Sequence, residues 1–242
     1  MKKTLSFILS LMLVIGVLTT LSVTASAADG ESGGYTFTLN EDGVSYTLTS
    51  CTKDVNGADI VLPDSYNGYP VTAIGNGVFQ RSGVKSVVVP NTVEHIGNGA
   101  FSCMSIFSVE LSSNLKTIGN SAFSVTNIKE IEIPDSVTYI GDYAFKLSSI
   151  KNIVIPDSVT YIGVSAFNSC ANLIDVNLPD SITFIGSSAF YSCANLADIT
   201  LPKNLTSIEE DTFYNCSSLT NITLPEGLVY IDMNVFYNTG LK

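Results

Sequence analysis

The sequence has few positively charged residues. It contains 11 Lys and Arg against 22 Asp and Glu, which gives a formal net charge of −11 at neutral pH. Proteins bind phosphate backbones and anionic lipid headgroups largely by placing Lys and Arg against them. The charge balance therefore argues against nucleic acid and against a membrane surface as partners of this chain.

Charged residues of either sign are also scarce, at 14% of the chain, whereas apolar residues make up 45%. Disordered chains have the opposite balance, with little apolar surface to bury and much net charge. The composition therefore predicts a folded protein. The length is enough for one domain with a sizeable core.

Signatures of common catalytic and metal sites are missing as well. The sequence has no Gly-x-Ser-x-Gly elbow, no phosphate-binding loop and no His-rich metal spacing. The single histidine, His95, is interpreted as an exposed substitution at a variable position. Asp135, Asp157 and Asp180 recur at one position, but turn formation explains them without calcium. The sequence therefore indicates no cofactor and no metal.

Residues 1–27 have the three parts of a secretory signal peptide. Two lysines come first, an apolar stretch covers residues 5–18, and small residues fill 25–27. A membrane anchor is the alternative, but the stretch is short and is interrupted by Ser6 and Ser10. We expect a secreted or cell-surface protein with no stable membrane insertion after cleavage.

One short pattern recurs through the rest of the chain. "IPDSVTYIGDYAF" (133–145) returns as "IPDSVTYIGVSAF" (155–167) and as "LPDSITFIGSSAF" (178–190). An isoleucine followed five residues later by phenylalanine occurs eight times, 22 or 23 residues apart. The eight isoleucines are Ile74, Ile96, Ile118, Ile140, Ile162, Ile185, Ile208 and Ile231.

Each repeat unit predicts a strand, a turn and a short segment that leads back to the next strand. Segments such as "IKNIVIP" (150–156) alternate apolar and exposed positions, as a half-buried strand does, and proline then ends the strand. A short extended piece follows, and we expect a helical turn around Ala-Phe. One unit is too small to bury its own apolar residues, so the units must stack into a solenoid.

The unit Ile-Pro-x-Ser-Val-Thr-x-Ile-Gly-x-x-Ala-Phe-x-x-Cys-x-x-Leu resembles the BspA-type leucine-rich repeat of bacterial surface proteins. "YNGYPVTAIG" (66–75) is similar to the variant that often opens such arrays. The resemblance implies an α/β leucine-rich repeat solenoid with one short parallel strand per coil and short helical turns on the opposite face. It also implies adhesion to host or neighbouring-cell components.

The chain departs from the commoner leucine-rich repeat at the asparagine column. That column holds Thr92, Asn114, Ser136, Ser158, Ser181, Asn204 and Gly227. A continuous asparagine ladder is excluded there, and we expect the small polar side chains to bond turn amides instead.

Three segments are expected. Residues 1–27 form the signal peptide, 28–56 form a lead and an amino-terminal β-hairpin cap, and 57–242 form about eight coils. The hairpin is indicated by two alternating runs around Asn-Glu-Asp-Gly within 35–51. No capping sequence follows the last repeat, so we expect that the end either packs on a partner or has lost further repeats or an anchoring module.

Cysteine recurs three residues after phenylalanine in consecutive units, at Cys170, Cys193 and Cys216. Disulfides are one interpretation for an exported chain. Buried thiols are the favoured one, because three in a row leave one unpaired and cysteine fills small apolar spaces well.

Two sets of exposed side chains are candidates for ligand binding. The first, which we call the strand face, comprises the outward positions of the predicted strands: Glu110, Glu130, Glu132, Asn152, Val154, Asp175, Asn177, Asp198 and Thr200. The second comprises two aromatic columns, Tyr139, Tyr161, Phe184 and Tyr191, Tyr214, Tyr237. Stacking between coils is the favoured interpretation of the aromatic columns.

We interpret the protein as a non-catalytic module that binds an extracellular protein or glycan through the solenoid surface. A passive spacer or display module of an envelope assembly is the first alternative. A secreted glycoside hydrolase is the second, since Glu110 and Glu132 occupy equivalent positions of adjacent coils. That alternative requires the two carboxylates to be enclosed in a cleft.

Overall fold

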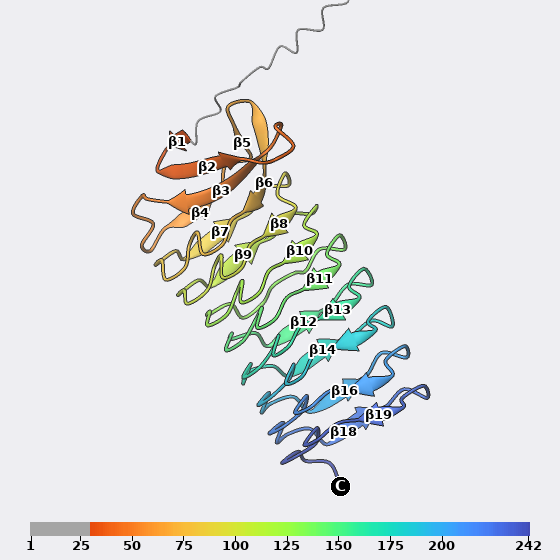
Figure 1. Cartoon of the computed structure of the whole chain (residues 1–242). Coiled ribbons are helices and arrows are strands. Elements are labelled where there is room, and N and C mark those ends of the chain that lie inside the picture. The colour runs from red at the N-terminus through yellow and green to blue at the C-terminus, as the bar shows by residue number, and fades with distance from the viewer. Residues whose placement is uncertain (1–29) are drawn as a thin grey trace, which may run out of the picture.

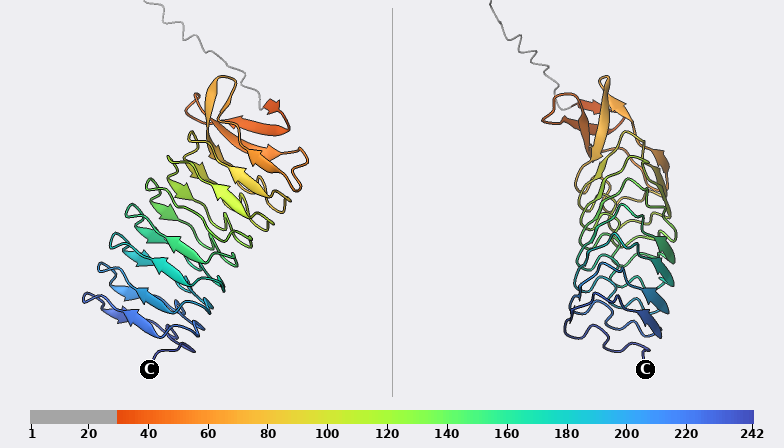
Figure 2. Two further views of the ribbon diagram at one scale, coloured as in Figure 1. Left: turned by 180° about the vertical axis from the view of Figure 1, so that it is seen from behind. Right: turned by 90° about the vertical axis from the view of Figure 1, so that its right-hand side faces the viewer.

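The computed structural model describes residues 30–242, which form a solenoid of about eight stacked coils behind an amino-terminal cap (Figure 1). The expected signal peptide lies outside the described residues. We number the coils by their repeat isoleucines, from Ile74 in coil 1 to Ile231 in coil 8. Figure 2 shows from two further sides that the coils follow one another along a single axis.

Most coils contribute two short strands rather than the predicted one. Coil 1 contains β4 (Asp59–Val61), the two-residue β5 (Ser65–Tyr66) and β6 (Tyr69–Ile74). The later first strands are β7 (Ser86–Val88), β9 (Ser108–Glu110), β12 (Asn152–Val154), β14 (Asp175–Asn177), β16 (Asp198–Thr200) and β18 (Asn221–Thr223). The later second strands are β8 (His95–Ile96), β10 (Thr117–Ile118), β11 (Tyr139–Ile140), β13 (Tyr161–Ile162), β15 (Phe184–Ile185), β17 (Ser207–Ile208) and β19 (Tyr230–Ile231).

The cap is built from β1 (Gly30–Ser32), β2 (Tyr35–Leu39) and β3 (Tyr46–Cys51). β2 and β3 pair antiparallel, and β3 then pairs in parallel with β6, so the hairpin continues the sheet of second strands. Its buried rings, Phe37 and Tyr46, pack at the amino-terminal end of the core. The cap therefore shields that end from solvent.

The repeat phenylalanines form one continuous file through the interior. Phe145 and Phe167 lie with ring centroids 5.4 Å apart, and Phe167 and Phe190 repeat the same distance. The file extends from Phe79 to Phe236 with nearly parallel rings throughout. The repeated side chains point inward, as the periodicity predicts, and each coil covers its neighbour's apolar edge.

The predicted helical turns were wrong, because residues 30–242 contain no helix. An α-helix needs successive amides to bond carbonyls four residues back. Here the amide of Phe145 donates to Ala166 O in the next coil at 2.8 Å, while the amide of Lys146 donates back to Tyr143 O at 3.0 Å. Tyr143 and Leu147 also have left-handed backbone, with φ of 58° and 57°. The segment is therefore a run of tight turns, and the fold class is an all-β solenoid.

Two left-handed positions recur in every coil, three and seven residues after the repeat isoleucine. The first column holds Gly77, Gly99, Ser121, Tyr143, Ser165, Ser188, Asp211 and Asn234, and the second holds Arg81, Cys103, Val125, Leu147, Ser169, Ser192, Asn215 and Asn238. Left-handed backbone reverses the chain within few residues. These two columns therefore shape the return side of each coil.

The glycine after the repeat isoleucine is required by the close stacking of coils. A Cβ on Gly163 would lie 2.5 Å from the carbonyl carbon of Gly141 and from the amide nitrogen of Asp142. Coil 7 has Glu209 in this column, and there the second-strand ladder is interrupted between β15 and β17. Coil 8 has Asp232 in the same column, and there β19 still pairs with β17, so the interruption is confined to the step between coils 6 and 7.

A side-chain ladder forms in a column that the sequence analysis did not consider, two residues after the repeat isoleucine. Asn76 Oδ1 accepts the amide of Asn98 at 2.7 Å, and Asn98 Oδ1 accepts that of Asn120 at 2.8 Å. Asp142 is the last rung of this ladder. In the expected asparagine column, Ser181 Oγ instead donates to Val159 O at 2.7 Å, so carbonyls rather than the predicted amides are bonded.

Candidate functional site

The strand face lies on the outward side of the first strands. Its members on β9, β12, β14 and β16 are exposed, while the alternate residues point into the core, as in Asn152–Ile153–Val154. Parallel register places Asn152 beside Asp175 and Val154 beside Asn177. The hydrogen-bonded ladder thus fixes rows of polar side chains at the spacing of the coils.

Glu130 and Glu132 differ from the other members because their segment forms no strand. Both side chains are exposed, and Ile131 between them is buried. The described residues provide no hydrogen-bond partner for the backbone groups of residues 130–133. The prediction of a strand in coil 4 was therefore wrong, although its inward and outward positions are as expected.

The first-strand ladder is interrupted in three places, which we call ladder breaks. It is open between coils 3 and 4, between coils 4 and 5, and between coils 6 and 7. The paired groups are β4-β7-β9, β12-β14 and β16-β18. Each ladder break coincides with a solvent-open groove on the strand face.

The three grooves have similar linings. The groove between coils 3 and 4 has a volume of about 350 Å³ and is lined by Glu110 and Glu132 above Val109. The groove between coils 4 and 5 measures about 560 Å³. The groove between coils 6 and 7, about 540 Å³, contains Asp175 and Asp198. Carboxylates over an apolar floor are therefore the shared chemistry of the ladder breaks.

Like charges coincide with two of the three ladder breaks, whereas at the third, between coils 4 and 5, Glu130 and Glu132 are opposite the uncharged Asn152 and Val154. Glu110 of coil 3 and Glu132 of coil 4 occupy equivalent positions, as do Asp175 of coil 6 and Asp198 of coil 7. Like charges directly opposite each other in a sheet are destabilising. The paired strands have no such contact: Asn152 faces Asp175, and Asp198 faces Asn221. Coil 4 has two glutamates, and the first-strand ladder is interrupted on both sides of it.

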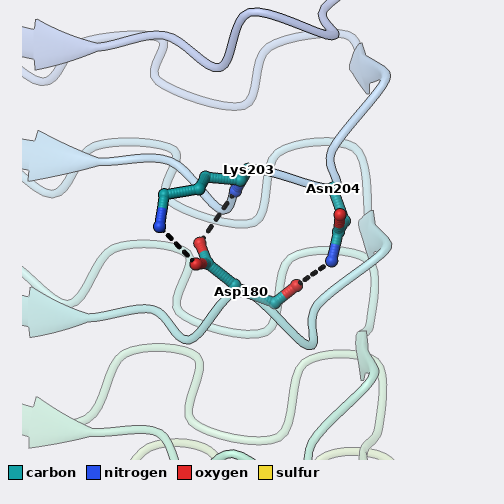
Figure 3. Close-up of polar contacts among 3 residues, drawn as sticks. All are labelled: Asp180, Lys203 and Asn204. Atoms are coloured by element: carbon teal, nitrogen blue, oxygen red, sulfur yellow. Dashed lines mark hydrogen bonds and ion pairs between the residues drawn. The ribbon is translucent and has the colours of Figure 1, made fainter.

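The turns next to the strand face contain an ion pair of opposite charges (Figure 3). Lys203 Nζ lies 2.8 Å from Asp180 Oδ2, and the amide of Lys203 donates to Asp180 Oδ1 at 3.0 Å. Asn204 Nδ2 donates to Asp180 O at 2.7 Å. The hydrogen bond from the Lys203 side chain lowers the pKa of the Asp180 carboxyl below its usual value. Asp180 therefore fastens two turns together.

No cluster of metal-ligating side chains exists within residues 30–242. The aspartates Asp135, Asp157 and Asp180 recur in one column of turns, but they do not form such a cluster. His95 bonds Thr117, with Nδ1 and Oγ1 2.9 Å apart, rather than a serine.

The aromatic columns form face-to-face stacks. Tyr139 and Tyr161 have centroids 5.0 Å apart, and Tyr161 and Phe184 have centroids 5.1 Å apart. The second column, Tyr191, Tyr214 and Tyr237, repeats this arrangement at 4.9 and 4.7 Å. Stacked rings present mainly their edges to solvent. Their faces therefore stabilise the contact between coils.

The three cysteines of the column are buried and free, as the favoured interpretation predicts. Cys170 Sγ donates to Phe145 O at 3.0 Å, and Cys193 and Cys216 repeat this bond one coil later each time. Burial raises the pKa of Cys170 to about 11 and that of Cys216 to about 12. These thiols stay protonated and pack in the hydrophobic core.

Catalysis by Glu110 and Glu132 finds little support in this geometry. Both carboxylates are exposed to solvent, and the groove that they share is open. Retaining glycosidases enclose their carboxylates and raise the pKa of one of them. The requirement for an enclosing cleft is not met.

Comparison with protein families finds the BspA type leucine rich repeat region, in six copies, over residues 50–172 and 138–242. No match is found among curated proteins. None of the described residues form a helix that could cross a membrane.

Two solved structures are similar over most of the chain. A leucine-rich repeat protein from Bacteroides ovatus is 32% identical, with a TM-score of 0.81 and with 88% of this chain covered. The chain spans 58% of that protein's length. The T. pallidum leucine rich repeat protein is 29% identical, with a TM-score of 0.63 and with 87% of this chain and 88% of that chain covered.

Proposed function

The chain belongs to the BspA-type leucine-rich repeat family, and from this premise we propose that it is a non-catalytic recognition module that binds an extracellular protein or glycan through the strand face. The matched family is one of repeat proteins rather than of enzymes. The extracellular location rests on the signal-peptide features of residues 1–27.

The observation that carries this proposal is the free charge of the strand face. The described residues contain two ion pairs, Lys85 with Asp59 and Lys203 with Asp180. Neither involves a carboxylate of the strand face. A fixed row of exposed, unneutralised carboxylates is suited to recognition, because electrostatic complementarity selects partners and speeds their association.

A direct experiment compares the wild type with Glu130→Ala/Glu132→Ala/Asp175→Ala on a glycan array and on a panel of purified extracellular matrix proteins. We expect at least one ligand to bind the wild type and to bind the triple variant at least tenfold more weakly. The matched control is Glu41→Ala/Glu94→Ala/Glu226→Ala, which removes the same charge from exposed positions elsewhere.

The alternatives give different results. A passive spacer would bind nothing on either panel, or would bind equally in both variants. A hydrolase would turn over a glycan on the array, and that turnover would disappear in Glu132→Gln. Either result would contradict the proposal.

A further inference from the structure

We propose that two of the ladder breaks, those between coils 3 and 4 and between coils 6 and 7, are docking points for basic side chains of a partner protein. In this arrangement an extended segment lies along the solenoid, with Arg or Lys residues four positions apart. One of them enters the break between coils 3 and 4, and the other enters the break between coils 6 and 7. The inference rests on the proposed function and specifies its partner.

The first argument is electrostatic. Glu110 and Glu132 line one break, and Asp175 and Asp198 line the other, so each of these two breaks has one carboxylate from each neighbouring coil. Lys129 and Lys151 begin the neighbouring segments, but the described residues show no ion pair between them and these carboxylates. A cation placed between two carboxylates would relieve their repulsion. Each break is therefore complementary to positive charge.

The second argument is the free backbone around residues 130–133. No described residue bonds the amides and carbonyls of Glu130 to Ile133. These groups need partners wherever they are shielded from water. A guanidinium carries five N–H donors in a fixed fork, enough for two carboxylates and a carbonyl. An arginine suits this break better than a lysine does.

The molecule itself contains ion pairs between adjacent coils. Lys203 of coil 7 reaches Asp180 of coil 6 just beyond the break between those coils (Figure 3). Lys85 of coil 2 likewise lies 3.6 Å from Asp59 of coil 1. A basic side chain bridging adjacent coils is therefore already compatible with this backbone.

A metal ion is a poorer occupant of the breaks. Residues 30–242 have no group of three or more ligating side chains close enough to hold a metal ion. Divalent cations such as calcium take six to eight oxygen ligands. Two carboxylates and open solvent suit the single charge of a side chain.

The distance between the two breaks sets the number of residues between the two basic side chains of the segment. The two breaks lie three coil spacings apart, about 14 Å along the solenoid axis, and their carboxylate pairs are offset by two residues along the strands, which makes the distance between the pairs about 16 Å. An extended segment advances about 3.3 Å per residue, so residues four apart are about 13 Å apart and point to the same side. Long, flexible basic side chains can span the few ångströms by which the distance between the pairs exceeds this spacing of the segment's residues. Val154, 64% exposed, lies between the breaks and offers an apolar contact to the residue in the middle.

The test uses two synthetic peptides of equal composition. Ser-Arg-Thr-Val-Thr-Arg-Ser has its arginines four positions apart, and Ser-Arg-Arg-Thr-Val-Thr-Ser has them adjacent. We expect the full chain to bind the first at least fivefold more tightly by fluorescence anisotropy. Glu132→Gln/Asp198→Asn should weaken that binding at least tenfold, whereas Glu41→Gln/Glu226→Gln, which removes the same charge, should change it less than twofold.

Equal binding of the two peptides, equal losses in the two variants or no binding at all would overturn the inference. A natural ligand whose binding is unchanged in Glu132→Gln/Asp198→Asn would also overturn it, while leaving the proposed function intact. Binding of the spaced peptide as expected, with no ligand on the extracellular panels, would instead contradict the proposed function alone.

Discussion

Val125 has a left-handed backbone conformation, with φ of 57°. A β-branched side chain in this conformation crowds its own backbone, and an L-residue pays roughly 1–2 kcal/mol for it. Coils 7 and 8 have Asn215 and Asn238 in the same column. Asparagine tolerates this region because its short polar side chain bonds locally.

We therefore expect Val125→Asn to stabilise the protein by about 1 kcal/mol. Val125 is 43% exposed, so the substitution removes little packing. Urea unfolding followed by circular dichroism would measure the change. Ser192→Asn, in the same column, is the control and should be nearly neutral. A Val125→Asn variant no more stable than the wild type would show that the left-handed turn is not strained.

The buried thiols give a second prediction at the scale of residues. Cys170, Cys193 and Cys216 are inaccessible, and burial raises the pKa of each thiol. Iodoacetamide at pH 8 should modify exposed Cys103 in the native protein and spare these three, since the thiolate is the nucleophile. All five cysteines should react in urea. Native modification of Cys193 would contradict the buried file of thiols.

The raised pKa values of the buried thiols determine how the stability of the protein changes with pH. The folded thiols hold their protons above the usual pKa of about 8.5, so the unfolded chain loses protons first as pH rises. Their contribution to stability is complete below about pH 8.5 and declines as pH rises towards 11 and 12. Alkaline conditions should therefore lower the urea midpoint.

At the scale of elements, the glycine column allows the backbones of neighbouring coils to approach closely. Gly163→Ala would place a methyl group 2.5 Å from the backbone of Gly141 and Asp142. Overpacking of this kind costs about 1–3 kcal/mol. Gly227→Ala is the matched control, because the nearest atom to its new Cβ would be 3.9 Å away. Thermal unfolding of both variants checks this, and equal melting temperatures would contradict the argument.

The ladder breaks are the second feature at this scale. Glu132→Gln removes the negative charge across the groove from Glu110, so the strands of coils 3 and 4 should pair. We expect the free energy of unfolding to rise by about 0.2–1 kcal/mol and hydrogen exchange at residues 130–133 to become slower. Mass spectrometry of exchanged peptides would measure it, with Glu41→Gln as control. Unchanged exchange in Glu132→Gln would mean that charge does not open the ladder.

At the scale of the whole molecule, the net charge of −11 acts on every coil. Stacking in register places carboxylates above one another, so self-repulsion is built into the array. Salt screens such exposed contacts over about 10 Å at 0.1 M. Raising NaCl from 20 to 500 mM should therefore shift the urea midpoint upward, by about 1 kcal/mol in unfolding free energy. A midpoint that falls with salt would contradict this.

The solenoid and its interior could be predicted from the sequence alone. An apolar side chain repeated every 22 or 23 residues can be buried only if equivalent positions stack, so the file from Phe79 to Phe236 follows from periodicity. The exposed positions of the strand face follow from the alternation in the same segments. The burial of Cys170, Cys193 and Cys216 follows from their recurrence in one column next to the repeat phenylalanines.

Only the tertiary structure decided how the backbone bonds are shared between coils. Whether the amide of Phe145 bonds within its turn or to Ala166 depends on the next coil, and that choice replaces the predicted helix with tight turns. Whether the segment of Glu132 forms a strand depends on hydrogen bonds to coils 3 and 5, which are distant in sequence and adjacent in space. Periodicity specifies which residues recur, whereas contacts between neighbouring coils determine which of their hydrogen bonds form.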